Sequence, residues 1–302
     1  MSKRGNDRHC VSLSMPKKET YHFTAEELAA FDFSCPSRTD IKRFMQPFAL
    51  YFSPEYIGLR KLTTDRPALF ITNHTVWGLL DGYPFGAALY LRKNIFIRTL
   101  ADRNHFRLEA WGNFVRQFGL VLASRRNCAA LMERKENILV FPGGAREICK
   151  RKGEAYTLKW NDRSGFVRMA MLYGYDIIPV AGVGGEEAYT VEKDATDFMQ
   201  TIPGKLLHLT GLYDQWLQGG QLIPPKISGV GGTLLPRPVK LFFSFGPRIS
   251  TRGYKKYADD KEKQQQIKDK VMASMQQQFA DLFARRDRYV ERNPLKRWLL
   301  KQ

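Results

Sequence analysis

Short apolar runs alternate with longer segments of helical apolar spacing through the middle of the chain. We expect strands at 68–72, 94–98, 119–123, 137–141, 176–183 and 239–245. Between the first five of these runs, apolar residues recur at helical spacing over roughly 77–91, 105–117, 127–135 and 163–173. Such alternation predicts an α/β fold with a largely parallel central sheet flanked by helices.

The segments outside this alternation predict extensions. Residues 41–52 carry apolar positions at helical spacing beside basic residues, and Pro47 is expected to kink or restart that helix. Residues 185–236 are rich in glycine and proline and predict a long irregular excursion, of the kind that often forms a binding wall or lid. A single apolar stripe predicts a long helix over about 259–290. The expected organisation is an N-terminal extension at 1–60, an α/β domain at 61–258, and a C-terminal helix with a basic tail at 259–302.

The formal net charge of +18 over 302 residues indicates an anionic partner, although a role in solubility alone is an alternative. No helix-turn-helix, zinc-finger or aromatic ribonucleoprotein pattern is present, so nucleic acid is not the expected partner. Near the C-terminus, Trp298 and several leucines lie among arginines and lysines. This combination is typical of contact with lipid headgroups and predicts an anionic membrane surface as a partner.

No apolar segment of secretory type follows the basic N-terminus, and no run of 18 apolar residues occurs. We therefore expect peripheral association with the cytoplasmic face of a membrane, without a signal peptide or a transmembrane span. The four cysteines lack short paired spacings, so no metal site is expected.

The richest candidate for chemistry is His74, which follows the apolar run 68–72 directly in Asn73-His74-Thr75. Open α/β folds place reacting groups at strand ends. In a helix beginning near residue 77, Asp81 would lie on the side of the histidine and could orient its imidazole. Gly78 would let a substrate or another backbone approach closely. The pattern predicts a general base that acts on a hydroxyl, and a purely structural histidine is the alternative.

Two other strand ends carry groups that could bind an anion. Gly143 and Gly144 follow the expected strand at 137–141, and backbone N–H groups of such a turn can form an anion-binding concavity. Arg146 could grip a phosphate or carboxylate, and Glu147 could pair with it or cap the site. Arg125 follows the strand at 119–123 and could reach a phosphate at a helix start. An ordinary turn and solvated charges are the alternatives, also for Lys150, Arg151, Lys152, Lys159 and Arg163.

Four blocks in this order resemble the glycerolipid acyltransferase superfamily, closest to its monoacylglycerol/diacylglycerol acyltransferase-like branch. They are Asn73-His74 with Asp81; Gly119 with Ser124-Arg125 and Asn127; Phe141-Pro142-Gly143-Gly144-Ala145-Arg146-Glu147; and Ile178-Pro179-Val180 with Gly185-Glu186-Glu187. The resemblance covers roughly residues 60–250.

The resemblance implies a glycerolipid-acyltransferase-like fold and an O-acyltransferase, an enzyme that transfers groups other than amino-acyl groups. Acyl-CoA or acyl-carrier protein would be the co-substrate, no cofactor or metal would be needed, and a lipid alcohol would be the acceptor. His74 would act as base with Asp81 as its partner, while Arg125 and Arg146 would hold phosphate. The substrate-binding candidates are Asn73, Gly78, Arg125, Gly143, Gly144, Arg146 and Glu147.

This chain departs from the superfamily pattern in two places. The superfamily has four residues between histidine and acid, whereas six separate His74 from Asp81, and Leu79 occupies the usual acid position. Phospholipid-making members carry glutamate where this chain has Gly143, which favours a diacylglycerol-like acceptor. A lysophospholipid or glycerol-phosphate acyltransferase and a non-catalytic lipid-binding protein are alternatives. A serine hydrolase is disfavoured because no Gly-x-Ser-x-Gly motif occurs.

Overall fold

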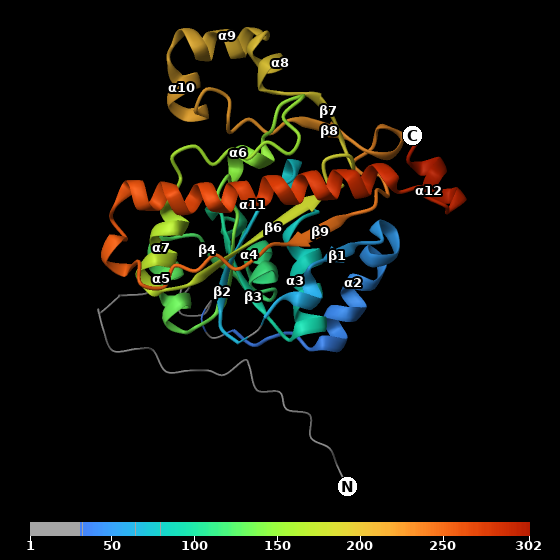
Figure 1. The fold of residues 1–302 in the computed structure, drawn as a ribbon. Coiled ribbons are helices and arrows are strands. Elements are labelled where there is room, and N and C mark those ends of the chain that lie inside the picture. Colours follow the sequence, from blue (N-terminus) through green and yellow to red (C-terminus); the bar gives the residue numbers. More distant parts are fainter. Residues whose placement is uncertain (1–30, 32, 64, 79) are drawn as a thin grey trace.

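A seven-stranded sheet forms the centre of the protein, in the order β1-β9-β6-β2-β5-β3-β4. The computed structural model describes residue 31 and residues 33–63, 65–78 and 80–302. Strands β6, β2, β5, β3 and β4 run parallel to one another, and β9 joins β6 antiparallel with β1 parallel to β9. The prediction of a largely parallel α/β sheet with flanking helices is therefore confirmed (Figure 1).

Six of the described strands lie close to the expected runs, whereas β1, β7 and β8 are not predicted by the sequence. The strands are β1 (Glu55–Ile57), β2 (Ala68–Thr72), β3 (Ile97–Ala101), β4 (Leu120–Leu122), β5 (Asn137–Val140), β6 (Asp176–Val183), β7 (Thr190–Lys193), β8 (Lys226–Ser228) and β9 (Phe242–Phe245). Every residue of β2 and β6 is buried. Strands in the middle of a parallel sheet are covered on both faces, which explains why these two runs are largely apolar rather than alternating.

The helices of the described residues are α2 (Arg38–Phe52), α3 (Gly82–Lys93), α4 (Glu109–Arg116), α5 (Arg125–Glu133), α6 (Ala145–Ile148), α7 (Gly165–Tyr173), α8 (Ala195–Met199), α9 (Ile202–Leu209), α10 (Leu212–Leu217), α11 (Lys261–Arg288) and α12 (Pro294–Leu299). Helix α2 continues through Pro47, so the expected restart there is wrong. None of the helices in the described part of the chain combines the length and apolar character that a membrane span requires.

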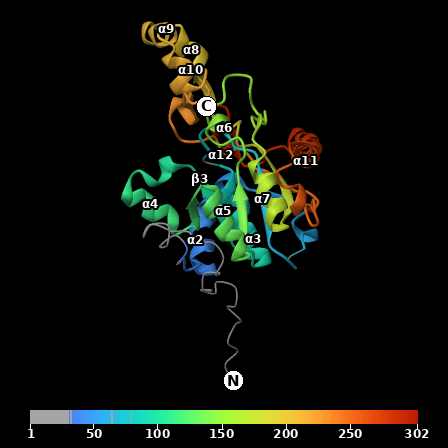
Figure 2. The same cartoon turned by 90° about the vertical axis from the view of Figure 1, so that its left-hand side faces the viewer.

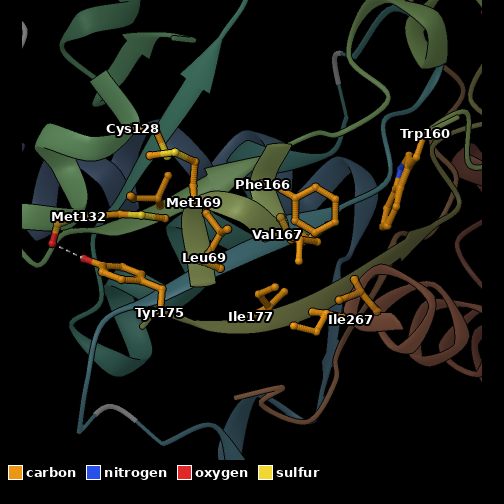
Figure 3. Packing of buried hydrophobic residues seen from close by; sticks show 14 of the residues in the cluster. Leu69, Cys128, Met132, Trp160, Phe166, Val167, Met169, Tyr175, Ile177 and Ile267 are labelled. Carbon is orange, nitrogen blue, oxygen red and sulfur yellow. Dashed lines mark hydrogen bonds between the residues drawn. The ribbon is translucent and has the colours of Figure 1, made fainter. Parts of the chain in front are cut away.

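Two apolar cores lie on opposite faces of the sheet. In β2, Leu69 and Ile71 point into one core, while Ala68 and Phe70 point into the other. Figure 3 shows the first core, where Leu69 and Ile177 of the sheet meet side chains from α5, α7 and α11. The second core lies between the sheet and α2 and α3. The alternation along β2 fixes its register, because a shift by one residue would exchange the two sets.

Helix α11 runs across one face of the sheet and packs on β6 and β9 (Figure 1). The carboxylate of Asp260 caps it by accepting the N–H groups of Glu262 and Lys263. Its buried apolar side chains are Ile267, Val271, Met275, Phe279 and Leu282. Their spacing of three or four residues makes the stripe that the sequence predicts for this helix.

The segment 185–236 is more regular than expected. It contains the β7–β8 pair and helices α8, α9 and α10. Figures 1 and 2 both show these three helices standing beyond the end of the sheet, with the short helix α6 between them and the strands. The prediction of an irregular segment is therefore wrong. Pro203 and Gly204 lie in the first turn of α9, and Gly211 lies between α9 and α10. The three helices have five to eight residues each and are too short to give a clear period.

We expect Met275→Ala to lower the free energy of unfolding by about 2–5 kcal/mol, because it leaves a cavity where α11 packs on the sheet. Met275 is fully buried, with 0% of its surface exposed. Urea denaturation measures the loss. Gln276→Ala is the matched control, since this neighbouring side chain is exposed and its removal should change the value by less than about 0.5 kcal/mol. Equal stability of the two variants would contradict the packing described for α11.

Candidate active site

The candidate site lies at the carboxyl ends of β2, β5 and β6, beneath α6. Asn73, the first residue after β2, is buried and joins two of these ends. Its amide nitrogen donates to the carbonyl of Gly182 at 3.1 Å, and its amide oxygen accepts the Gly182 N–H at 2.9 Å. Because this reciprocal pair locks the exit of β2 to β6, the next residue, His74, leaves the sheet in a fixed direction.

The imidazole of His74 is held by a carboxylate on one side and an aromatic ring on another. Its Nδ1 lies 2.6 Å from Oδ2 of Asp81, and its ring stacks on Phe141 with centroids 3.9 Å apart. The same Asp81 oxygen accepts the backbone N–H of Thr75 at 2.7 Å. With Nδ1–H donating to Asp81, Nε2 is the nitrogen left to accept a proton.

The environment of Asp81 favours its ionised form. Burial by itself would raise the pKa of this carboxyl group. The charge of His74, together with hydrogen bonds from His74 and Thr75, outweighs burial and holds the pKa of Asp81 below its ordinary value. A carboxylate in this state can stabilise the imidazolium that forms when His74 takes up a proton.

Asp81 reaches His74 across a tight turn and not along a helix. Trp77 and Gly78 both have positive φ, of 60° and 65°, and helix α3 begins only at Gly82. The expected helix from residue 77 is therefore wrong, although the two side chains do meet. A Cβ on Gly78 would lie 2.5 Å from Cε1 of His74, so glycine is required both by the backbone and by the ring. Leu79 lies outside the described residues.

A fully buried carboxylate, that of Glu147, holds the backbone of His74. Its Oε2 accepts the His74 N–H at 2.6 Å, and its Oε1 accepts the Lys159 N–H at 3.0 Å. Glu147 thus pairs with backbone groups rather than with Arg146. Gly143 makes room for it, since a Cβ at position 143 would lie 2.2 Å from Cδ of Glu147. Burial raises the pKa of Glu147, against the opposing effect of the nearby Lys150 charge.

Lys150 holds the other side of the same peptide segment. Its ammonium donates to the carbonyl of His74 at 2.7 Å and lies 2.5 Å from Oε1 of Glu186. The second oxygen of Glu186 accepts the N–H of Val76 at 3.2 Å. Only 2% of the Lys150 side chain is exposed. The carboxylates of Glu147 and Glu186 and the ammonium of Lys150 therefore hold the backbone around His74 by hydrogen bonds.

In front of His74 lies a cavity of about 520 Å³. Its walls come from α2, α3, β3, β5 and the segments near them, and most of the lining side chains are apolar. The polar side chains of the lining include those of Asp102, Asn104, His105, Arg163 and Gln218. The volume falls within the usual range for a small-molecule site.

The predicted site residues are not all placed together. His74, Asp81, Gly78 and Gly144 line the cavity, whereas Asn73, Gly143 and Glu147 support the site from behind. Arg125 is exposed at the start of α5, outside the cavity lining. The guanidinium of Arg146 also lies outside the lining and donates to the side-chain oxygen of Gln218, at 3.0 and 3.3 Å.

Arg163 is the only lysine or arginine among the described residues of the cavity lining. Its guanidinium donates to the carbonyls of Pro142 and Gly143 at 3.1 and 2.8 Å. Burial, and then the neighbouring charge of Arg146, lower the pKa of Arg163. Neither Arg163 nor the buried Lys150 stands out in the sequence, because both fall in a run of cations that also contains solvated side chains.

Comparison with known proteins shows what this chain resembles. Residues 53–183 match the model of the family described as Acyltransferase. Phytyl ester synthase 1, chloroplastic, of Arabidopsis thaliana is 29% identical to this chain over 254 residues, which is 80% of this chain and 36% of that protein. The chain thus spans about a third of the length of this relative.

Two further comparisons concern proteins of lipid synthesis. The human protein called DGAT1/2-independent enzyme synthesizing storage lipids is 28% identical over 132 residues, which is 44% of this chain and 40% of that protein. The solved 1-acyl-sn-glycerophosphate acyltransferase PlsC of Thermotoga maritima aligns with a TM-score of 0.48 and 16% identity, over 84% of this chain and 81% of that one. The matched family segment, 53–183, contains His74, Asp81, Glu147 and Lys150.

We expect Lys150→Met to lower the free energy of unfolding by roughly 3–5 kcal/mol, because it leaves buried carboxylates without their cation. Loss of Lys150 also raises the pKa of Glu147 further. The deficit should therefore be largest above that pKa and shrink as the pH falls through it, where the carboxyl becomes neutral.

Urea denaturation across a pH series measures this effect. Lys152→Met is the matched control, because Lys152 pairs with Asp197 at the surface with 49% of its side chain exposed and should change stability little. A Lys150→Met deficit that did not depend on pH would contradict the role given to the buried charges.

Proposed function

We propose that this protein is an O-acyltransferase that moves a fatty acyl group from an acyl thioester to the hydroxyl of a lipid alcohol. The observation that carries the proposal is the His74–Asp81 pair in the lining of a largely apolar cavity. A base that is fixed beside an apolar cavity suits a reaction in which a long hydrocarbon chain must lie next to a reacting hydroxyl. The acyltransferase-family match supports the same reaction class.

In the proposed reaction, Nε2 of His74 takes the proton of the acceptor hydroxyl, and Asp81 stabilises the resulting imidazolium. The hydroxyl oxygen attacks the thioester carbonyl, so that a C–O bond forms and the C–S bond breaks. The departing thiolate takes the proton from His74, which returns to its starting state. The reaction needs no covalent acyl-enzyme, and the co-substrate is acyl-CoA or acyl-carrier protein.

The negative oxygen that develops during attack needs a hydrogen-bond donor. The Gly144 N–H already donates to the carbonyl of Phe141 at 3.0 Å within its own turn. We therefore assign this role to Arg163, which lies beside Gly144 in the cavity lining. Arg146 lies outside the lining and is assigned to the donor's phosphate groups.

Two classes of acceptor follow from different observations. The resemblance of the Gly143 block favours a neutral, diacylglycerol-like acceptor. The similarity to a phytyl ester synthase over 80% of this chain favours a long-chain isoprenoid alcohol. Both acceptors are uncharged lipid alcohols, and both agree with the small number of cations along the cavity.

We further propose that the enzyme acts at an anionic membrane surface through its C-terminal segment. In α12, Leu295 and Trp298 are 64% and 57% exposed, and the cations Lys296 and Arg297 lie between them. Aromatic and aliphatic side chains interleaved with cations suit the headgroup region of a bilayer.

We expect His74→Gln to reduce ester formation by about 10²–10⁴-fold, because the general base is lost while the size of the side chain is nearly kept. The assay incubates purified protein with acyl-CoA or acyl-carrier protein donors and with diacylglycerol, phytol or lysophosphatidate, and follows thioester loss and ester gain together. An unchanged urea midpoint for the variant excludes unfolding as the cause. Full activity of His74→Gln, or lipid binding without turnover by the unmodified protein, would refute the proposed function.

We expect Gly86→Phe to shift the preference toward shorter acyl chains. Gly86 lies on α3 in the cavity lining, and a Cβ placed there would meet no atom within 4 Å, so a large side chain would extend into the space. The measurement is kcat/KM over a series of donor chain lengths. Gly86→Ala is the matched control, because its single methyl group fills little of the cavity. The same chain-length profile in all three proteins would contradict this placement of the acyl chain.

A further inference from the structure

Helix α9 presents apolar side chains to solvent. Ile202, Leu206 and Leu209 are 84%, 61% and 82% exposed, and their spacing of four and three residues places them along one side of the helix. Soluble proteins bear scattered exposed apolar residues, but three large aliphatic side chains on one eight-residue helix form a patch. The only ionisable side chains of α9 are Lys205 and His208, so no carboxylate opposes transfer of the patch into a lipid interface.

The same segment forms part of the rim of the cavity. Gln218, directly after α10, and Leu222 line the cavity together with His74. Gln218 accepts from Arg146, and the carbonyl of Gly219 accepts from Arg151 at 2.8 Å. On the other side of the segment, Lys152 lies 2.8 Å from Asp197 of α8. These contacts fasten the α8–α10 helices, which stand beyond the end of the sheet in Figures 1 and 2, to α6 and to residues 151–152. Ala145 and Ile148 of α6 also line the cavity.

We propose that the apolar side of α9 inserts into a lipid surface and so places the mouth of the His74 cavity against the bilayer. The reason for this placement, delivery of a lipid alcohol to His74, rests on the proposed function. The insertion itself does not rest on it.

A lipid surface is the occupant that fits the size of the patch. A stable dimer generally buries more than about 1,000 Å² with well-packed partners. Three aliphatic side chains on a short, protruding helix present only a fraction of such an area. A bilayer interface, by contrast, accepts a small inserted apolar group, and each inserted side chain adds to the affinity. Because the contact is apolar, it should persist at high salt, unlike the contact proposed for the cations near α12.

The test is flotation of the full chain with vesicles of phosphatidylcholine alone, at low and at high salt. We expect the protein to float under both conditions. The triple variant Ile202→Gln, Leu206→Gln, Leu209→Gln should lose at least tenfold in partition coefficient, since glutamine keeps the helix propensity and removes the apolar patch. The control is Leu108→Gln, because Leu108 is 72% exposed but lies at the start of α4, outside the α8–α10 segment.

Hydrogen–deuterium exchange provides the second measurement. Vesicles should protect the amides of 202–209 in the unmodified protein and in Leu108→Gln. Failure of the unmodified protein to float, a loss of less than twofold in the triple variant, or an equal loss in Leu108→Gln would overturn the inference. So would a monomer-to-dimer difference between the unmodified protein and the triple variant in sedimentation, which would assign the patch to a second copy. No donor or acceptor is present, so these outcomes are independent of the acyl-transfer assay.

Discussion

The hydrogen bond from the backbone of His74 to the buried carboxylate of Glu147 is the constraint on which the site depends. Glu147 follows β5, whereas His74 follows β2, so this contact ties two neighbouring strand ends together. It places a carboxylate where water is excluded, and that position is tolerable because backbone N–H groups and Lys150 surround it. The position of this backbone segment determines the orientation of the His74 imidazole, its contact with Asp81 and its place in the cavity lining.

Much of the fold follows from the sequence because its physical cause is local. A central parallel strand is covered on both faces, and the largely apolar run 176–183 predicts β6 with the bounds that the structure has. Helix α11 likewise follows from one apolar stripe. The helices at 195–217 do not, because each has only five to eight residues, too few for a helical period to stand out in the sequence.

Less of the candidate site than of the fold can be predicted from the sequence. His74 at the end of β2 can be found from its strand alone, but its contact with Asp81 depends on two consecutive left-handed residues, Trp77 and Gly78. No pattern of apolar residues encodes that turn. Lys150 and Arg163 belong to one cationic run in the sequence, yet one is buried behind His74 and the other lies at the rim of the cavity. Tertiary packing distinguishes the roles of these two residues, whereas the pattern of charges along the sequence does not.

The close approach of Gly143 and Glu147 has a consequence for how this protein can change. Any side chain at position 143 would occupy the space of the Glu147 carboxylate, and without that carboxylate the His74 N–H would be buried and unsatisfied. A single substitution at either position therefore disturbs the hydrogen bond to the His74 N–H. A paired exchange that moves the carboxylate from position 147 to position 143 can keep that bond. The effect of a substitution at one of the two positions therefore depends on the residue at the other. A redesign of acceptor preference around this turn must change the two residues together.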